Sequence, residues 1–140
     1  EGTLASTGTP TVTETSGPAI TPTVGAQVSG SATLQFRDLY DLDRNEINDF
    51  GEDLSYEEVD LKHNLIPIDN TLLAAAGSNQ PSMTTCQGMN LSSEPVTVDN
   101  LVGNYFCYQT NMSLPGWLYI NTLDPENGNL NVQIFTWLIP

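Results

Sequence analysis

Basic residues are scarce in this chain: its 140 residues include only 3 Lys or Arg against 17 Asp or Glu, and the formal net charge is −14. A surface this acidic repels the phosphates of nucleic acids and the headgroups of anionic membranes. The sequence also lacks any apolar run of the roughly 20 residues that a membrane helix needs. We therefore expect no nucleic-acid partner and no membrane insertion of the mature chain.

Residues typical of catalytic sites are rare as well. The single histidine, His63, lies between Lys62 and Asn64 in an ordinary polar segment, and no Gly-x-Ser-x-Gly, P-loop, dinucleotide-binding or Cys-x-x-Cys motif occurs. Paired carboxylates can hydrolyse glycosidic bonds, but so small a domain offers no evident deep pocket. The sequence therefore predicts that the protein is not an enzyme. If it were one, a small hydrolase that uses carboxylates of its acidic stretch would be the alternative.

Only two cysteines are present, Cys86 and Cys107, and no neighbouring His or Cys could complete a zinc site. In an acidic, strand-rich chain this pair indicates one disulfide, formed in an oxidising compartment. Two buried free thiols are the alternative. The first residues lack the basic and apolar regions of a signal peptide, and no Met precedes them. We expect an exported, extracellular protein in its mature form.

Thr, Ser, Gly and Pro dominate the N-terminal region, a composition that cannot bury enough apolar surface to fold alone. Residues 1–23 are expected to form an extended arm, and residues 24–140 a single domain. The segment 9–15 is β-branched and poor in charge, so it can add to the edge of a sheet. Its candidate donor-strand residues are Thr9, Thr11, Val12, Thr13 and Thr15.

Strand signals are plentiful in the domain. Apolar or small residues alternate with polar ones from Val24 to Phe36, which is the period of a β-strand. An Asn-Gly pair within residues 124–129 predicts a hairpin between the last two strands. The final strand is apolar on both faces near its end, as expected for a strand that is covered twice. The further strands are expected over residues 95–99, 104–110, 117–123 and 130–139.

Two segments are less regular in the sequence. The acidic stretch 38–60 is expected largely in loops, with residues 55–60 as a short strand or helical turn. Residues 69–77 fit a short helix, or nearly as well a strand that ends in a loop. The predicted fold class is all-β: a β-sandwich, Ig-like or jelly-roll-like, with an N-terminal donor-strand arm and one short helix.

The sharpest local pattern lies in the acidic stretch, where oxygen-bearing residues recur at the spacing of a twelve-position calcium loop from Asp41 to Glu52. The segment resembles an EF-hand loop, although Glu46 stands where the sharp turn normally requires Gly. A strand precedes the segment, so we expect a calcium loop within a β domain rather than a helix-loop-helix pair. The candidate ligands are Asp41, Asp43, Asn45, the Ile47 carbonyl, Asp49 and Glu52, and the further oxygens Asp38, Asp53, Glu57, Glu58 and Asp60.

A solvated acidic loop that only keeps the protein soluble is the alternative to this calcium site. Ten carboxylates within residues 38–60 favour the metal, because like charges at this density repel one another unless they are neutralised.

Aromatic residues concentrate in the C-terminal half, where core packing is a commoner fate for them than sugar binding. Two tripeptides, beginning at Asn90 and Asn111, match the acceptor sequence for N-glycosylation. The aromatic residues concerned are Tyr105, Phe106, Tyr108, Trp117, Tyr119, Phe135 and Trp137.

The whole architecture, a Thr-rich arm followed by a compact β-domain with one disulfide, resembles the donor-strand-complemented pilins of archaea and bacteria that polymerise without a chaperone. The resemblance implies a helical filament of identical subunits, a cell-surface appendage in which each arm completes the neighbour's sandwich and calcium stiffens the subunit. The alternative function is a calcium-dependent β-sandwich module that binds carbohydrate, with surface glycans as partners.

Overall fold

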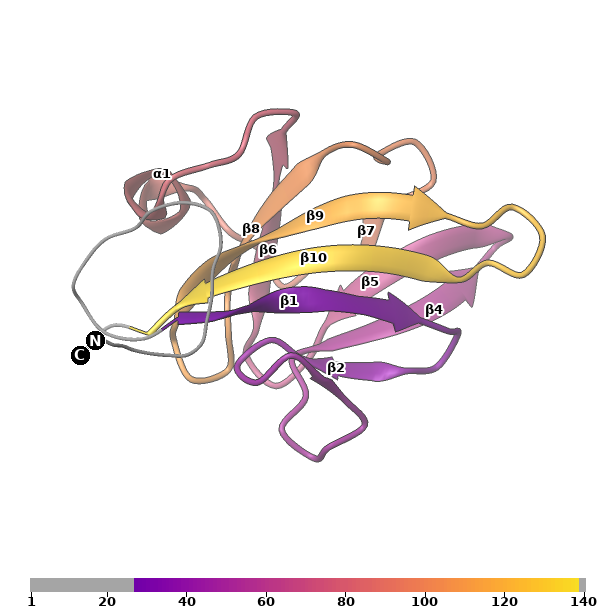
Figure 1. Cartoon of the computed structure of the whole chain (residues 1–140), viewed down its shortest axis with the longest axis horizontal. Coiled ribbons are helices and arrows are strands. Elements are labelled where there is room, and N and C mark those ends of the chain that lie inside the picture. Colours follow the sequence, from indigo (N-terminus) through magenta and orange to yellow (C-terminus); the bar gives the residue numbers. More distant parts are fainter. Residues whose placement is uncertain (1–26, 139–140) are drawn as a thin grey trace, which may run out of the picture.

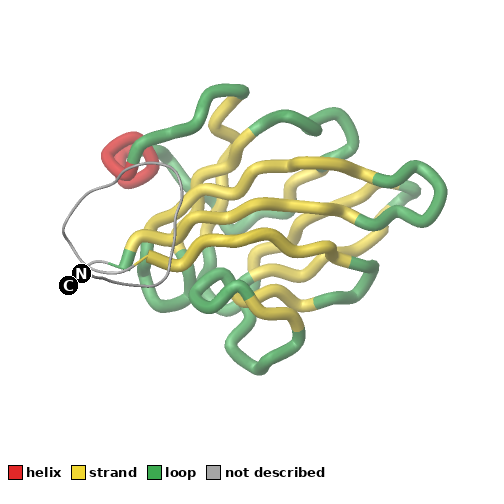
Figure 2. Tube along the Cα trace, viewed as in Figure 1, coloured by secondary structure: helices red, strands yellow, loops and turns green. Residues whose placement is uncertain are grey.

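The computed structural model describes residues 27–138, so the predicted donor strand and the start of the predicted domain lie outside the described residues. Two five-stranded antiparallel sheets pack against each other as a β-sandwich (Figures 1 and 2). This confirms the predicted all-β sandwich.

The first sheet has the strand order β1-β10-β9-β8-β6. None of its strand residues is Asp, Glu, Lys, Arg or His, and we call it the uncharged sheet. Its strands are β1 (Gln27–Leu34), β10 (Leu130–Trp137), β9 (Pro115–Leu123), β8 (Tyr105–Gln109) and β6 (Leu72–Gly77).

The second sheet has the order β3-β2-β4-β5-β7 and shorter strands. It carries Asp41, Glu46, Glu57, Glu58 and Lys62 in its strands, and we call it the charged sheet. Its strands are β3 (Glu46–Ile47), β2 (Leu39–Asp41), β4 (Leu54–Val59), β5 (Lys62–Pro67) and β7 (Val96–Thr97).

The core lies between the sheets and is built on the period-two pattern of the strands. In β10, Leu130, Val132 and Ile134 alternate along the strand and are buried on its core-facing side. Hydrogen bonds also cross the core: the Tyr56 hydroxyl donates to the Gly128 carbonyl (2.7 Å), and the Thr136 hydroxyl donates to the Leu42 carbonyl (2.7 Å). These buried polar groups are therefore satisfied across the two sheets.

The one helix of the described residues, α1 (Met83–Gly88), covers part of the outer face of the uncharged sheet. Ser82 caps it by accepting a hydrogen bond from the Thr85 N–H (3.1 Å). The Cys86–Cys107 disulfide joins the helix to β8, with 5.1 Å between the Cα atoms. The predicted disulfide is confirmed, and the free-thiol alternative is excluded.

Of the two alternatives for residues 69–77, the strand is confirmed and the short helix is wrong: residues 72–77 form β6, paired with β8. The acidic stretch is more regular than predicted, because it contains β2, β3 and β4. Its residues 55–60 are mostly strand rather than a helical turn.

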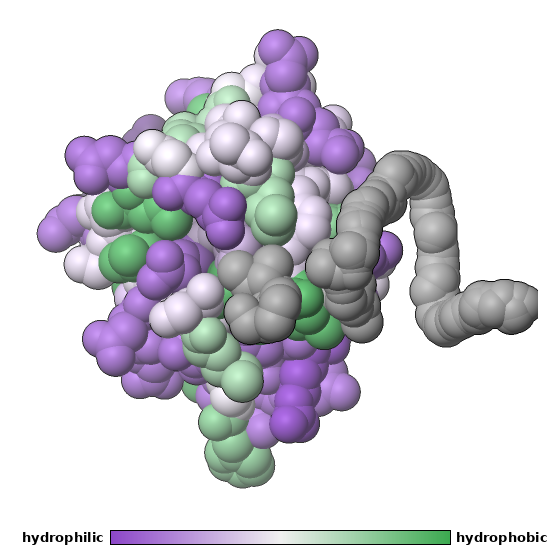
Figure 3. Space-filling view, turned by 90° about the vertical axis from the view of Figure 1, so that its left-hand side faces the viewer, coloured by the Kyte–Doolittle hydropathy of each residue, from purple (hydrophilic) through white to green (hydrophobic). Residues whose placement is uncertain are grey.

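Some large hydrophobic side chains reach the surface, above all Phe50 (98% exposed), Leu61 (84%) and Met112 (68%). Figure 3, which looks at the left-hand side of Figure 1, shows hydrophobic patches divided by hydrophilic residues. Within residues 27–138, no helix has the length and apolar character needed to cross a bilayer.

Candidate metal centre

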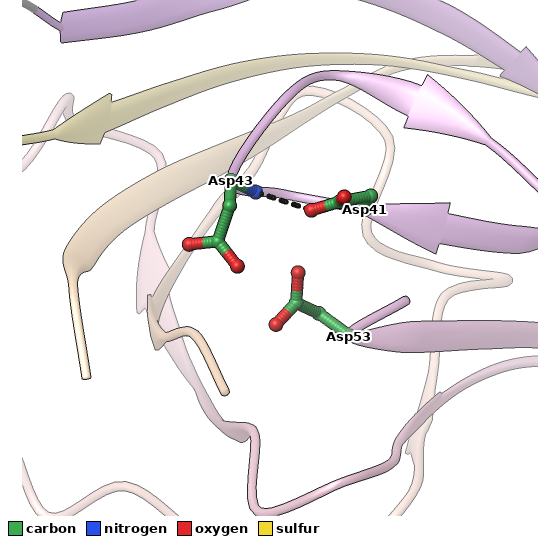
Figure 4. A group of neighbouring side chains, drawn as sticks. All are labelled: Asp41, Asp43 and Asp53. Atoms are coloured by element: carbon green, nitrogen blue, oxygen red, sulfur yellow. Dashed lines mark hydrogen bonds between the residues drawn. The ribbon is translucent and has the colours of Figure 1, made fainter. Parts of the chain in front are cut away.

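Three carboxylates meet at one end of the charged sheet. Asp41 ends β2, Asp43 follows two residues later, and Asp53 directly precedes β4. The antiparallel pairing of β2 with β4, which places Tyr40 opposite Leu54, brings the two ends together. One carboxylate oxygen from each aspartate lies within 4.8 Å of the others, and Figure 4 shows the side chains converging.

Hydrogen bonds fix the positions of two of these carboxylates. Asp53 is fully buried and accepts from the Leu42 N–H (2.7 Å), the Asn111 N–H (2.7 Å) and the Thr71 hydroxyl (3.1 Å). Asp41 is 2% exposed and accepts from the Asp43 N–H (2.8 Å). Two of the three carboxylates are thus held in place by hydrogen bonds from the protein itself.

The Asp43 carboxylate has an unused acceptor. Its Oδ1 is buried and has no hydrogen-bond partner within residues 27–138. An unpaired buried oxygen of a charged group is costly, and a bound cation removes that cost.

Burial is the largest influence on all three carboxyl groups. It raises the pKa of Asp41, helped by the neighbouring Asp49 carboxylate, and it raises the pKa of Asp53. Burial also raises the pKa of Asp43 to about 6; the Thr110 hydroxyl counteracts this, while the Asp53 charge adds to it. Without a cation, the cluster therefore holds protons more readily than exposed carboxyls do.

The cluster opens to solvent through a hollow of about 300 Å³. Asp41 and Asp43 line it together with Asp49, while the exposed Phe50 and Met112 stand at its sides. Its remaining lining residues are Arg44, Gly51 and Asn111. An ion can reach the carboxylates from this side.

Gly51 and Asn111 hold the loop against the cluster. A Cβ atom on Gly51 would lie 2.7 Å from Asp41 Oδ2, so a larger residue would displace the Asp41 carboxylate. The Asn111 amide donates to the carbonyls of Gly51 (3.4 Å) and Glu52 (3.2 Å). Of the two glycosylation tripeptides, the one at Asn111 thus has its amide engaged, whereas Asn90 is exposed.

Of the six predicted ligands, two belong to the three-carboxylate group, Asp41 and Asp43. Asp49 lies beside Asp41 and has a lowered pKa, to which the Gly51 N–H contributes most. The Asn45 side-chain oxygen accepts from the Tyr40 hydroxyl instead of facing the group.

The last two predicted ligands also lie outside this group. Ile47 is in β3 opposite Tyr40, and the Glu52 carboxylate accepts from the Phe50 N–H (2.5 Å). Asp53, which the sequence offered only as a further oxygen, completes the group. The ligand set of an EF-hand-like loop stays a prediction.

The other candidate residues occupy different places. His63 Nδ1 lies 2.8 Å from Asp99 Oδ2, and its ring stacks on Phe36. Phe106 and Tyr108 belong to the core. The remaining aromatic residues pack on the outer face of the uncharged sheet, beside the disulfide: Tyr105, Trp117, Tyr119, Phe135 and Trp137.

No protein-family model, curated protein or solved structure matches this chain.

Proposed function

We propose that this protein is an extracellular, calcium-binding structural subunit that assembles with identical subunits into a filament. The observation that carries the proposal is the buried group of Asp41, Asp43 and Asp53, open to solvent on one side. A cation bound to this group would hold segments of the fold together.

Calcium fits the chemistry of this group better than zinc does. All three side chains offer hard carboxylate oxygens, and the group contains no His or Cys. Calcium accepts six to eight oxygens in an adaptable geometry, whereas magnesium demands a near-octahedral set. Asp49 and water in the hollow would supply the further oxygens.

A structural role follows from what the carboxylates join. Asp41 belongs to β2, Asp53 precedes β4, and Asp53 also binds the backbone of Asn111, which lies between β8 and β9. A cation here replaces the mutual repulsion of three carboxylates by attraction to one centre. An ion bound to Asp41 and Asp53 would therefore hold the ends of β2 and β4 together, next to the Asn111 backbone that Asp53 binds.

Assembly with identical subunits is supported by the distribution of charge. Only two of the 17 acidic residues, Glu1 and Glu14, lie within residues 1–26, and no strand residue of the uncharged sheet is charged. These are the parts of a strongly acidic protein that can approach another copy without strong repulsion. The disulfide agrees with an oxidising, extracellular location.

Calcium binding is tested by thermal unfolding with calcium and with chelator, compared between Asp43→Asn and Asp60→Asn. Asp60 is an exposed turn residue with a φ of 53°, which Asn also adopts readily, so its change removes the same charge away from the group. Calcium at about one hundred times its Kd should stabilise the wild type and Asp60→Asn by about 2.7 kcal/mol. Asp43→Asn should lose most of this gain. An unfolding temperature of the wild type that is the same in calcium and in chelator contradicts the site.

Filament formation is tested by electron microscopy of the protein with and without chelator. We expect filaments in calcium, and soluble monomers after deletion of residues 1–15. Filaments that form normally from the truncated chain exclude assembly through the arm.

The second candidate function, carbohydrate binding, rests on the aromatic outer face of the uncharged sheet. Trp137, Phe135 and Tyr119 are only partly buried there, and partly exposed rings can stack on sugar rings. A glycan array probed with wild type and Trp137→Ala distinguishes the two functions. Binding to a defined glycan that is lost in the variant favours the sugar-binding module.

A further inference from the structure

The four edges of the two sheets differ in how well they are protected. In the charged sheet, the edge strands β3 and β7 have only two residues each. In the uncharged sheet, β6 has six residues, is interrupted by a register shift, and is paired at Leu73 with Ser92. The fourth edge, β1, has eight residues and a continuous register with β10.

Backbone hydrogen bonds fix which groups of β10 face β1. In β9, the Ile120 N–H donates to the Asn104 carbonyl (3.0 Å), and the Ile120 carbonyl accepts from the Gly103 N–H (2.8 Å). Ile120 thus faces β8, and by alternation its neighbour Tyr119 faces β10, where it pairs with Gln133. The even-numbered residues of β10 are then left to pair with β1.

It follows that the N–H and carbonyl groups of the even-numbered residues of β1 form hydrogen bonds with β10. Gly30, for example, pairs with Ile134. The odd-numbered residues direct theirs away from the sheet. The Asn45 amide, which donates to the Ser31 carbonyl from outside the sheet (3.5 Å), agrees with this alternation. Within residues 27–138, no backbone partner covers the outward groups of Gln27, Ser29, Ser31 and Thr33.

The sequence of β1 has none of the features that usually prevent an edge strand from pairing with another strand. Proteins usually protect an exposed edge with Lys, Pro, a bulge or a very short strand. β1 contains no charged residue and no Pro, and no register shift interrupts its pairing with β10. Its core-facing residues Val28, Gly30 and Ala32 remain only partly buried, so an added strand would cover them.

Segment 9–15 of the chain has the properties of a strand that would pair here. It is rich in β-branched residues and carries one charge, at Glu14. Its seven residues would span about 23 Å, close to the length of an eight-residue strand. Pro10 has no N–H. Backbone groups alternate in direction along a strand, so the backbone of Pro10 faces away from β1 when Thr11 and Thr13 pair with β1.

The geometry points to the outer edge of β1 as the site that accepts segment 9–15 of a second copy of this chain. The inference rests on the proposed filament and names its contact. Pairing the arm of one subunit with β1 of the next is head to tail, so it propagates instead of closing. The incoming strand must take the Ser31 carbonyl from Asn45, which holds it by a single long hydrogen bond.

The first experiment places Pro on each of the two edges of the uncharged sheet in the full chain. Ser29→Pro removes an N–H that β1 does not use within its own sheet, so the fold should tolerate it. Ala75→Pro is the matched control on β6. The Leu73 N–H donates away from β8, to Ser92 (2.8 Å), and by alternation the Ala75 N–H also points away from the sheet. Circular dichroism and calcium binding verify that both variants are folded.

We expect Ser29→Pro to reduce the assembled fraction about tenfold or more, and Ala75→Pro to leave it unchanged. Normal filaments from folded Ser29→Pro, with loss in Ala75→Pro, overturn the β1 assignment while the filament itself stands. A wild type that forms no filaments with or without calcium overturns the proposed function instead.

The second experiment identifies the source of the strand. In an antiparallel pair, residues that direct their backbone groups at each other lie opposite one another on the same face, so Thr11 can lie opposite Ser29. A full chain with Thr11→Cys and Ser29→Cys is oxidised and separated on a non-reducing gel, beside a control with Thr11→Cys and Ala75→Cys. A ladder of cross-linked multimers in the first chain, absent from the control, supports the second copy. A cross-linked monomer shows that the arm folds back on its own β1, and it overturns the inference.

Discussion

The two sheets of this sandwich share one core but differ completely in charge. The uncharged sheet contains no Asp, Glu, Lys, Arg or His in its strands, whereas the charged sheet and its connecting loops hold the three-carboxylate group. The uncharged sheet has long strands, and a disulfide ties it to a helix. The charged sheet has shorter strands and ends in buried carboxylates.

This difference indicates two ways of stabilising a small domain. Apolar burial and a covalent link suffice for the uncharged sheet, and its lack of charge suits contact with other copies. The charged sheet concentrates the repulsion of carboxylates at one end, and an ion bound there would relieve it. The two regions can therefore be perturbed separately by substitutions.

Loss of the disulfide should have the largest effect, and it should be confined to the uncharged sheet. Replacing both Cys86 and Cys107 by Ala opens a link between residues 21 apart in sequence, which should lower the free energy of unfolding by about 3 kcal/mol. Denaturant unfolding measures this loss, and calcium titration of the folded variant serves as the control. A marked fall in calcium affinity would show that the two regions are coupled rather than separate.

Asp53→Asn should destabilise the charged sheet even without calcium. The Asp53 carboxylate accepts three buried hydrogen bonds, and an amide placed there presents N–H groups to at least one donor. We expect a loss of about 2 kcal/mol in chelator, together with loss of calcium binding. Asp60→Asn is the matched control. Equal unfolding curves for the two variants in chelator would mean that these hydrogen bonds contribute little.

The pH dependence of the calcium-free protein should reveal the cost of the buried carboxylates. The folded pKa of Asp43 is raised from 3.8 to about 6, so the folded state binds more protons than the unfolded state between these values. Stability is therefore greatest below pH 4 for this group and is lost as the pH rises through about 6.

Comparison of Asp43→Asn with the wild type isolates this contribution. In chelator at pH 7, the variant should be more stable by about 1 kcal/mol, allowing for partial exposure of the group, and the difference should vanish near pH 4. In saturating calcium at pH 7, the wild type should instead be more stable than Asp43→Asn. A variant less stable than the wild type in chelator at pH 7 contradicts the assignment of repulsion to this site.

Much of the uncharged sheet could be predicted from sequence, because its signals are local. The alternation in residues 24–36 and 130–139 and the Asn-Gly turn placed β1, β10 and the last hairpin correctly. Residues 72–77 were ambiguous, since Leu-Leu-Ala-Ala-Ala suits a helix, and only pairing with β8 decides for a strand. Helix α1 was missed because its residues have little apolar periodicity; the cap at Ser82 was the available signal.

The candidate site was predictable only in part, for a physical reason. Asp41 and Asp43 are neighbours in sequence, so a local template finds them. Asp53 reaches them through the pairing of β2 with β4, which no twelve-residue template contains. Asn45 fits the template, yet its side-chain oxygen is taken by Tyr40, a tertiary contact that the spacing does not show.

The smallest effect is expected for Asp99→Asn, at the exposed side of the charged sheet. Partial burial by itself raises the pKa of Asp99. Asp99 also accepts hydrogen bonds from the backbone N–H of His63 (2.7 Å) and from its Nδ1 (2.8 Å), and together these bonds leave the pKa of Asp99 lowered. Its contribution is thus present above the usual carboxyl pKa and is lost as the pH falls through the lower, folded value. Both side chains are about one fifth exposed, so the variant should lose less than about 1 kcal/mol at pH 6, and less still at pH 2. Denaturant unfolding at the two pH values measures this. A loss as large as that of Asp53→Asn would mean that surface pairing, and not the buried carboxylates, governs the stability of the charged sheet.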